Sequence, residues 1–104
     1  MKNYPNEMSG IFLLGRIEFF QKRYKEALRR FRRTLVISDE YHVDRDLVLK
    51  SMIYTCLCLD HLKQKKALKT YLKDLYDSAS ETEIQELLRE EGLEEEWEKI
   101  RAQI

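Results

Sequence analysis

The fold is decided by residues 14–35, which read LGRIEFFQKRYKEALRRFRRTL. Gly15 and Ala27 are small residues at the spacing that lets two antiparallel helices cross closely. The large apolar residues around this pair follow at helical intervals: Tyr24, Phe31 and Leu35. A weaker copy follows, in which Ala67 lies 40 residues after Ala27 and Tyr71 lies 40 residues after Phe31. Helical hairpins repeated at about this period are typical of helical solenoids, most of which bind other proteins.

The composition indicates one all-α domain. The chain has 104 residues, with 3 Gly, 1 Pro and 37% charged residues. Leu, Lys, Glu and Arg recur with helical periodicity and no alternating strand pattern is present, which excludes a β-rich fold. The sequence has neither a signal peptide nor the roughly 20 apolar residues of a membrane span. We therefore expect no membrane partner and a cytoplasmic location, or a nuclear one in a eukaryote.

Apolar periodicity divides the chain into six helices in three pairs. The predicted ranges are 9–21, 25–37, 46–61, 65–76 and 80–104, the last broken at Gly92. We expect Ser9 to cap the first helix, or the helix to start a few residues earlier, and Asp44 or Asp46 to cap the third. Ser80 and Glu83 have the spacing of a capping box, which opens the fifth helix. The third helix is apolar nearly all round and should be the central one.

The sequence contains no recognisable catalytic or metal-binding set. Cys56 and Cys58 lie two residues apart, so on a helix they point about 200° from each other and cannot form a disulfide. We interpret them as small buried residues of a protein in a reducing compartment. His42 and His61 are far apart in the chain, and no Gly-rich phosphate loop is present. We expect no enzyme activity, no cofactor and no metal.

The stretch of residues 14–35 resembles the tetratricopeptide repeat. In that family a Leu-Gly-type pair on the first helix precedes Tyr-x-x-Ala on the second, followed by an aromatic residue and then Ala-Leu. Thr34 replaces the usual Ala, and Glu18 stands where an aromatic residue is usual, with Phe19 beside it. The positions that match are Leu14, Gly15, Tyr24, Ala27, Phe31 and Leu35. In the second copy Ala67, Tyr71 and Leu75 match, whereas Thr55 and Asp74 depart from the pattern.

This resemblance implies a short right-handed solenoid in a single domain, residues 1–104. Its parts would be one repeat over 8–37, a second over 46–76 and an acidic capping pair over 80–104. In the family, the first helix of each pair lines a concave groove. In register, the partner-binding residues would be Phe12, Arg16, Phe19, Phe20, Leu49, Met52 and Leu59.

Such an apolar groove with one cation suits a peptide or helix of a partner protein, so we expect an interaction or scaffolding module. Alternatively, the fifth helix or a second copy of the chain fills the groove, as in a self-associating structural protein. A further alternative is a regulatory module of a larger assembly or a transcriptional regulator. The stretch from the third helix to Glu83 loosely resembles the bacterial transcriptional activator domain, without its Glu-Leu-Gly ending.

Charge is segregated along the chain although the total is zero. Residues 1–50 carry a net charge of +4 and residues 51–104 a net charge of −4. We interpret the arginines at 29–33 as a solvated convex face and the glutamates of 77–98 as an acidic cap. The sequence also allows a homo-oligomer in which the basic part of one copy contacts the acidic part of the next. Nucleic acid is disfavoured, because Phe31 belongs to the core rather than to a stacking surface.

Overall fold

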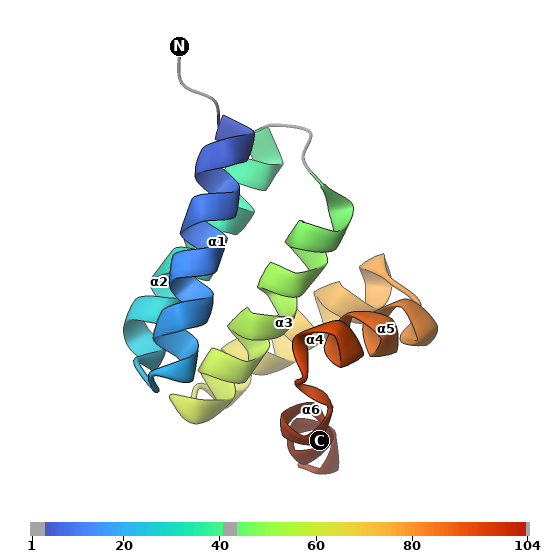
Figure 1. Ribbon diagram of the computed structural model, residues 1–104. Helices are drawn as coiled ribbons and strands as arrows, with labels where there is room; N and C mark the ends of the chain where they lie inside the picture. Colours follow the sequence, from blue (N-terminus) through green and yellow to red (C-terminus); the bar gives the residue numbers. More distant parts are fainter. Residues whose placement is uncertain (1–3, 41–43, 104) are drawn as a thin grey trace.

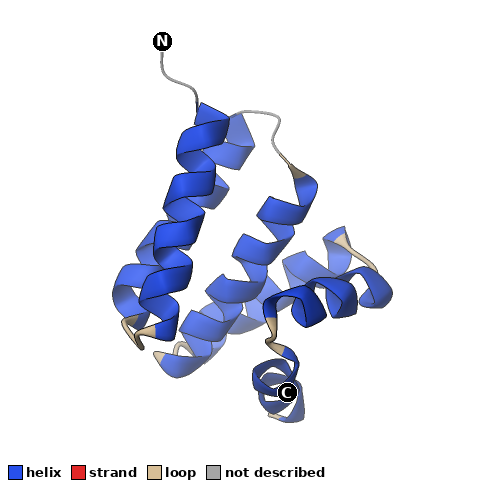
Figure 2. Cartoon of the chain, viewed as in Figure 1, coloured by secondary structure: helices blue, strands red, loops and turns tan. Residues whose placement is uncertain are grey.

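Six helices make up the part of the chain that the structure, a computed structural model, describes: residues 4–40 and 44–103. They are α1 (Tyr4–Phe20), α2 (Tyr24–Glu40), α3 (Arg45–His61), α4 (Lys65–Ser78), α5 (Glu81–Glu91) and α6 (Glu94–Ala102). No strand occurs in these ranges, which confirms the all-α class (Figures 1 and 2).

The predicted cap of the first helix and the predicted end of the second were wrong. α1 begins at Tyr4, as the alternative of an earlier start allowed, so Ser9 lies inside the helix and does not cap it. Pro5 is the second residue of α1, where a missing backbone N–H is tolerated. α2 continues to Glu40 rather than ending at residue 37. The Ser38 hydroxyl donates to the Leu35 carbonyl at 2.7 Å, a local bond that is compatible with a continuing helix. His42, expected in the following loop, lies outside the described residues.

The capping predictions for α3 and α5 are confirmed. The Asp44 side chain accepts a hydrogen bond from the Asp46 N–H at 3.0 Å and caps α3. Ser80 Oγ accepts from the Glu83 N–H at 3.2 Å and caps α5. Gly92 ends α5 with φ of 69°, in the left-handed region that favours glycine.

The three helical pairs are closed by turns of the same geometry. The residue at the centre of each turn has a positive φ: 64° at Lys22, 60° at Lys63 and 69° at Gly92. The N–H of this residue bonds to the carbonyl three residues before it, and the next N–H bonds five residues back, in all three turns. The turns between α1 and α2, α3 and α4, and α5 and α6 are therefore equivalent backbone structures of the helix-ending type.

The spacing between the first two of these turns is one residue longer than the repeat spacing predicted from residue types. The hydrogen bonds around Lys22 recur around Lys63 with a shift of 41 residues, not the expected 40. With this shift, Ala27, Phe31 and Thr34 of α2 correspond to Leu68, Leu72 and Leu75 of α4, and all six are buried. Ala67 and Tyr71, which were aligned by residue type, are only partly buried.

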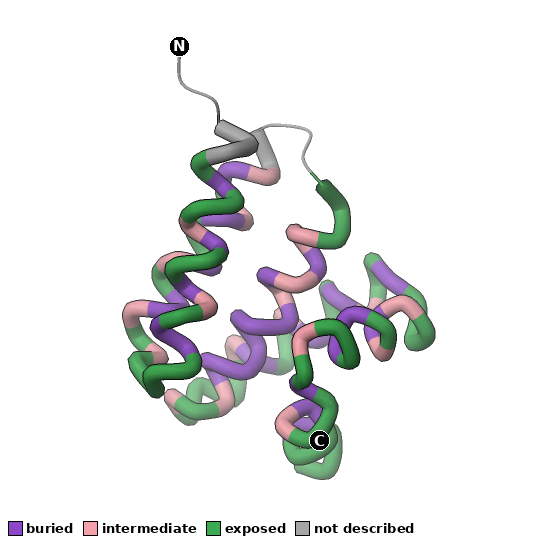
Figure 3. The backbone as a smooth tube through the Cα atoms, viewed as in Figure 1, coloured by how far each residue is buried: buried purple, intermediate pink, exposed green. Residues whose placement is uncertain are grey.

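α3 is the central helix, as predicted. It contacts all five of the other helices and lies between the α1–α2 pair and the remaining helices (Figure 1). Residues 53–59 are buried without interruption, which Figure 3 shows as a continuous purple segment. The all-round apolar sequence of this helix is explained by its neighbours on every side.

α1 and α2 approach each other closely at Gly15. A Cβ atom added there would lie 2.9 Å from Arg30 Cβ and 3.1 Å from the ring of Phe31. One turn further along, the buried carboxylate of Glu18 accepts from Arg30 Nε at 3.1 Å. The predicted crossing at Gly15 is confirmed, although the side chains nearest to it are Arg30 and Phe31 rather than the expected Ala27.

We expect Gly15→Ala to lower the free energy of unfolding by about 1–2 kcal/mol, because steric overlap with Arg30 and Phe31 outweighs the better helix propensity of alanine. Gly10 is the matched control, since a Cβ there meets nothing within 4 Å. Gly10→Ala should stabilise the protein by about 0.5–1 kcal/mol. Urea unfolding followed by circular dichroism measures both, and equal effects of the two substitutions would contradict the close approach.

Cys56 and Cys58 are free and buried, as predicted from their spacing. Burial raises the pKa of both thiols, that of Cys58 to about 12. The folded protein therefore keeps both thiol protons at a pH where the unfolded chain releases them near the usual pKa of 9.0. Because the unfolded state then binds fewer protons, stability falls as the pH rises above that value.

Between pH 8 and 10, each thiol should contribute a loss of stability that approaches about 1.4 kcal/mol per pH unit above its unfolded pKa. The Cys56→Ala/Cys58→Ala variant should show a shallower decrease over the same range. Denaturant unfolding at a series of pH values gives the two slopes. Parallel slopes would show that the thiols are not protected by burial.

Candidate functional site

Four of the seven predicted partner-binding residues belong to the core. Phe12, Phe19, Leu49 and Leu59 are all buried in the cluster that joins the helices. Side chains in this position are unavailable to a partner in this conformation. The inner side of α1 and α3 is therefore a packed interface rather than an open apolar groove.

Aromatic rings fill the space between α1, α2 and α3. The Tyr54 ring stacks on Phe31 with centroids 4.8 Å apart. Phe12 and Phe19 meet the same ring edge-on, at 5.8 and 5.1 Å. Such offset and edge-on pairs add about 0.5–1.5 kcal/mol each beyond the burial of their area. Tyr54 is thus the ring around which the two predicted anchors, Phe12 and Phe19, are packed.

Arg16, predicted to orient a partner, is paired within the chain. Its Nε lies 3.2 Å from Glu91 Oε1 at the end of α5. The Tyr54 hydroxyl donates to the same oxygen at 2.8 Å, and Lys50 Nζ lies 3.4 Å from Glu91 Oε2. Burial, together with this hydrogen bond to Glu91, raises the pKa of Tyr54, which stays protonated. These contacts join the end of α5 to α3 and to α1.

Removing the charge of Glu91 should destabilise the protein, because that carboxylate joins three helices. Its side chain is 7% exposed, and we expect Glu91→Gln to lower the free energy of unfolding by about 1–3 kcal/mol. Glu90 also pairs with Lys50, but its side chain is 58% exposed, so Glu90→Gln should cost less than about 1 kcal/mol. Thermal and urea unfolding measure both variants; an equal effect would argue against the buried network.

The other two predicted residues, Met52 and Phe20, lie on different surfaces. Met52 is half-buried in a trough between α2 and α4 that Val36, Val48 and Tyr71 also line. Phe20 lies at the end of α1 and is exposed. The structure brings Phe12 and Phe19 together around Tyr54, but the seven residues do not form one surface.

Phe20 belongs to an exposed apolar stripe that we call the outer face of α1: Leu13, Ile17 and Phe20. These side chains are 51%, 55% and 57% exposed and follow one another at helical spacing. With Arg16 and Gln21 they line a shallow hollow of about 560 Å³. Leu14, next to the stripe, is also exposed. Three large apolar side chains on one open surface are a candidate contact site for another molecule.

The sequence reasoning missed Leu13 and Ile17 as site residues. The available signal was that α1, like α3, carries apolar residues on all sides. A helix of this type is normally covered all round. α3 is covered by its neighbours, whereas α1 is covered on one side only by the described residues.

Other chemistry is sparse in the part of the chain that the structure describes. Over residues 4–40 and 44–103, no three His, Cys, Asp or Glu side chains gather as metal ligands would. Among the described helices, none has the length and apolar character needed to cross a membrane. No family model, curated protein or solved structure matches the chain.

Proposed function

We propose that this protein is a protein-binding module built from tetratricopeptide-like helical hairpins, and that the outer face of α1 binds an amphipathic helix of a partner protein. The observation that carries the proposal is the stripe of Leu13, Ile17 and Phe20, each more than half exposed. Exposed apolar surface of this kind usually marks a contact with another macromolecule. Helices that bind in this way are anchored by apolar residues at the same one-turn spacing.

Two features support the likeness to tetratricopeptide repeats. The close approach of α1 and α2 at Gly15 is the packing that the family's small residue allows. The equivalent turns at Lys22, Lys63 and Gly92 make the chain a series of three similar hairpins. The short right-handed solenoid is part of the proposal, with α5 and α6 as its capping pair.

The second helical pair indicates what covers such a face. The shift of 41 residues makes Leu13 and Ile17 of α1 equivalent to Tyr54 and Cys58 of α3, which are fully buried. Tyr54 stacks on Phe31 of α2, so α2 lies over the part of α3 that corresponds to the open stripe. A partner helix in the same place on α1 would bury Leu13 and Ile17 as α2 buries the corresponding part of α3.

The charged residues around the stripe indicate which charges a partner helix should carry. Arg16, which borders the stripe, is already neutralised by Glu91. Lys22 and Arg23 are exposed just beyond the end of α1, and neither takes part in an ion pair within residues 4–40 and 44–103. We therefore expect a partner helix whose apolar residues recur every three to four positions, with an uncharged centre and carboxylates at the end beside Lys22 and Arg23.

A photo-crosslinking residue placed at Phe20 in the native cell tests this proposal. The matched control carries the photo-crosslinking residue at Val36, an apolar position on α2 that is also about half exposed. We expect a cross-link that is specific to position 20 and that mass spectrometry maps to an amphipathic helix of another protein. Equal cross-linking at both positions would overturn the proposal, and a cross-link to α1 of a second copy would replace it by self-association.

Substitution of the stripe gives the affinity test once that helix is available as a peptide. Leu13→Ser/Ile17→Ser should weaken its binding by about 2–4 kcal/mol, as loss of apolar anchors does. Because both side chains are exposed, the free energy of unfolding should change by less than about 0.5 kcal/mol per site. Val36→Ser should leave the affinity unchanged. Isothermal titration calorimetry provides the comparison.

A further inference from the structure

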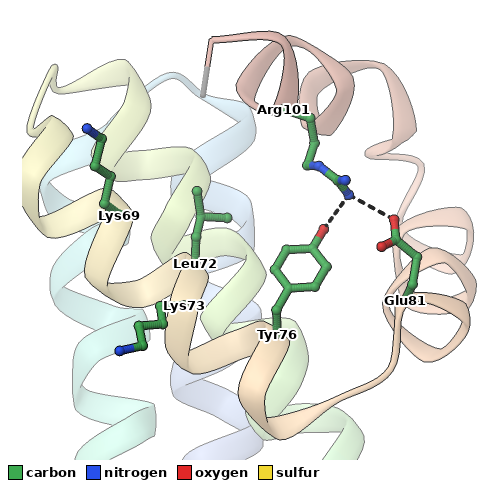
Figure 4. A pocket seen from close by; sticks show the side chains of 6 residues that line it. All are labelled: Lys69, Leu72, Lys73, Tyr76, Glu81 and Arg101. Carbon is green, nitrogen blue, oxygen red and sulfur yellow. Dashed lines mark hydrogen bonds and ion pairs between the residues drawn. The ribbon is translucent and has the colours of Figure 1, made fainter.

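A basic pocket lies between α4, the start of α5 and α6, away from the outer face of α1 (Figure 4). It encloses about 440 Å³. Its lining consists of Lys69, Leu72, Lys73, Tyr76, Glu81 and Arg101. Three cations and one carboxylate give this lining a net charge of +2. A concave site with convergent polar groups and an apolar wall is the usual form of a small-ligand site.

The Tyr76 hydroxyl is arranged to donate a hydrogen bond to a ligand. Its oxygen accepts from Trp97 Nε1 at 3.1 Å and from Arg101 Nη1 at 2.8 Å. These two bonds use both lone pairs of the oxygen. No acceptor for its own proton is present among residues 4–40 and 44–103. The hydroxyl proton is therefore free for an acceptor atom in the pocket.

Arg101 is held in place by groups of the pocket itself. Its Nη1 donates to Glu81 Oε1 at 2.8 Å as well as to Tyr76, as the dashed lines in Figure 4 show. The guanidinium carbon also lies 5.3 Å from the centre of the Tyr76 ring. A guanidinium has five N–H donors, so most of them remain for a ligand. Glu81 thus orients the cation while its own charge is neutralised.

Lys69 and Lys73 supply charge that the chain does not neutralise. They lie one turn apart on α4 and both are exposed; Figure 4 shows Leu72 between them and both ammonium groups directed away from Tyr76 and Arg101. Neither forms a salt bridge with any residue that the structure describes. Leu72 and the Tyr76 ring form the apolar part of the wall. The pocket therefore combines a mainly apolar wall with hydrogen-bond donors and a net positive charge.

We infer that this pocket binds the phosphate group of an organic phosphate monoester. Such a group carries a charge of about −1.5 to −2 at pH 7 and presents three acceptor oxygens. It matches a lining with a net charge of +2, in which Tyr76 and Arg101 hold donors in place and the flexible side chains of Lys69 and Lys73 can turn toward the phosphate. A carboxylate would neutralise only half of that charge. The apolar wall suits the carbon skeleton that carries the phosphate.

Phenyl phosphate is the probe for this inference, because it joins a phosphate monoester to one small ring. NMR titration of the full chain should show saturable shifts at Lys69, Lys73, Tyr76 and Arg101. Benzoate, which has the same ring and a single charge, should bind at least tenfold more weakly. Equal affinity for the two compounds, or the absence of saturable shifts at these residues, would overturn the inference.

Lysine variants separate the pocket from general basic character. Lys69→Gln/Lys73→Gln should weaken phenyl phosphate binding at least tenfold. The control Lys65→Gln/Lys66→Gln removes the same charge from the same helix outside the pocket and should weaken binding less than threefold. Similar losses in both variants would overturn the inference. Tyr76→Phe keeps the ring and should also weaken binding severalfold; unchanged affinity would overturn the role of the hydroxyl.

A second comparison, of a phosphopeptide with phenyl phosphate, distinguishes a phosphorylated protein from a small metabolite as the source of the phosphate. A peptide that contains phosphotyrosine and binds at least tenfold more tightly than phenyl phosphate would assign the group to a modified protein. Equal affinity of the peptide and phenyl phosphate would assign it to a small metabolite. Both results support a phosphate site, and neither depends on the outer face of α1.

Discussion

The buried ring of Tyr54 is the contact on which the arrangement of the helices depends. It stacks on Phe31 of α2 and meets Phe12 and Phe19 of α1, while its hydroxyl donates to Glu91 of α5. One side chain of α3 therefore joins members of all three helical pairs. A buried hydroxyl without an acceptor is costly, so Glu91 must stay close, and the position of α5 is coupled to the packing of the rings.

This coupling decides which surfaces of the molecule are open. The end of α5 brings Glu91 to Arg16 and Lys50, so the one cation of the expected groove is already neutralised from within the chain. The rings of Phe12 and Phe19 are buried on the same side of α1. The apolar residues of α1 that remain open lie beside this packed side, and the ring of Phe20 meets the edge of the Tyr54 ring with centroids 6.3 Å apart. Burial of the inner side thus makes the outer face the stronger candidate for a partner.

Local signals in the sequence were sufficient for most of the fold. Ser80, Asp44 and Gly92 act on backbone groups within a few residues, so they could be recognised from residue type and spacing alone. The central position of α3 followed from its all-round apolar character. The repeat spacing was one residue short because Ala67 and Tyr71 resemble Ala27 and Phe31 in type, whereas burial follows the geometry of the turns.

The candidate site was less predictable, for a physical reason. α1 is apolar on all sides, so its sequence alone cannot specify which side is covered. That choice depends on where α2, α3 and α5 lie, which is a property of the whole chain. The pairing of Arg16 with Glu91 joins residues 75 positions apart, and no local pattern marks it.

The short turns also set the order in which the chain can assemble. Each pair is closed by two or three residues, so little entropy is lost when its helices come together. Most helix contacts join neighbours in the chain, a topology that is associated with fast folding. During synthesis the α1–α2 pair can close around Gly15 before α3 has left the ribosome. The outer face of α1 would then be available as soon as this pair has closed, before the later helices are in place.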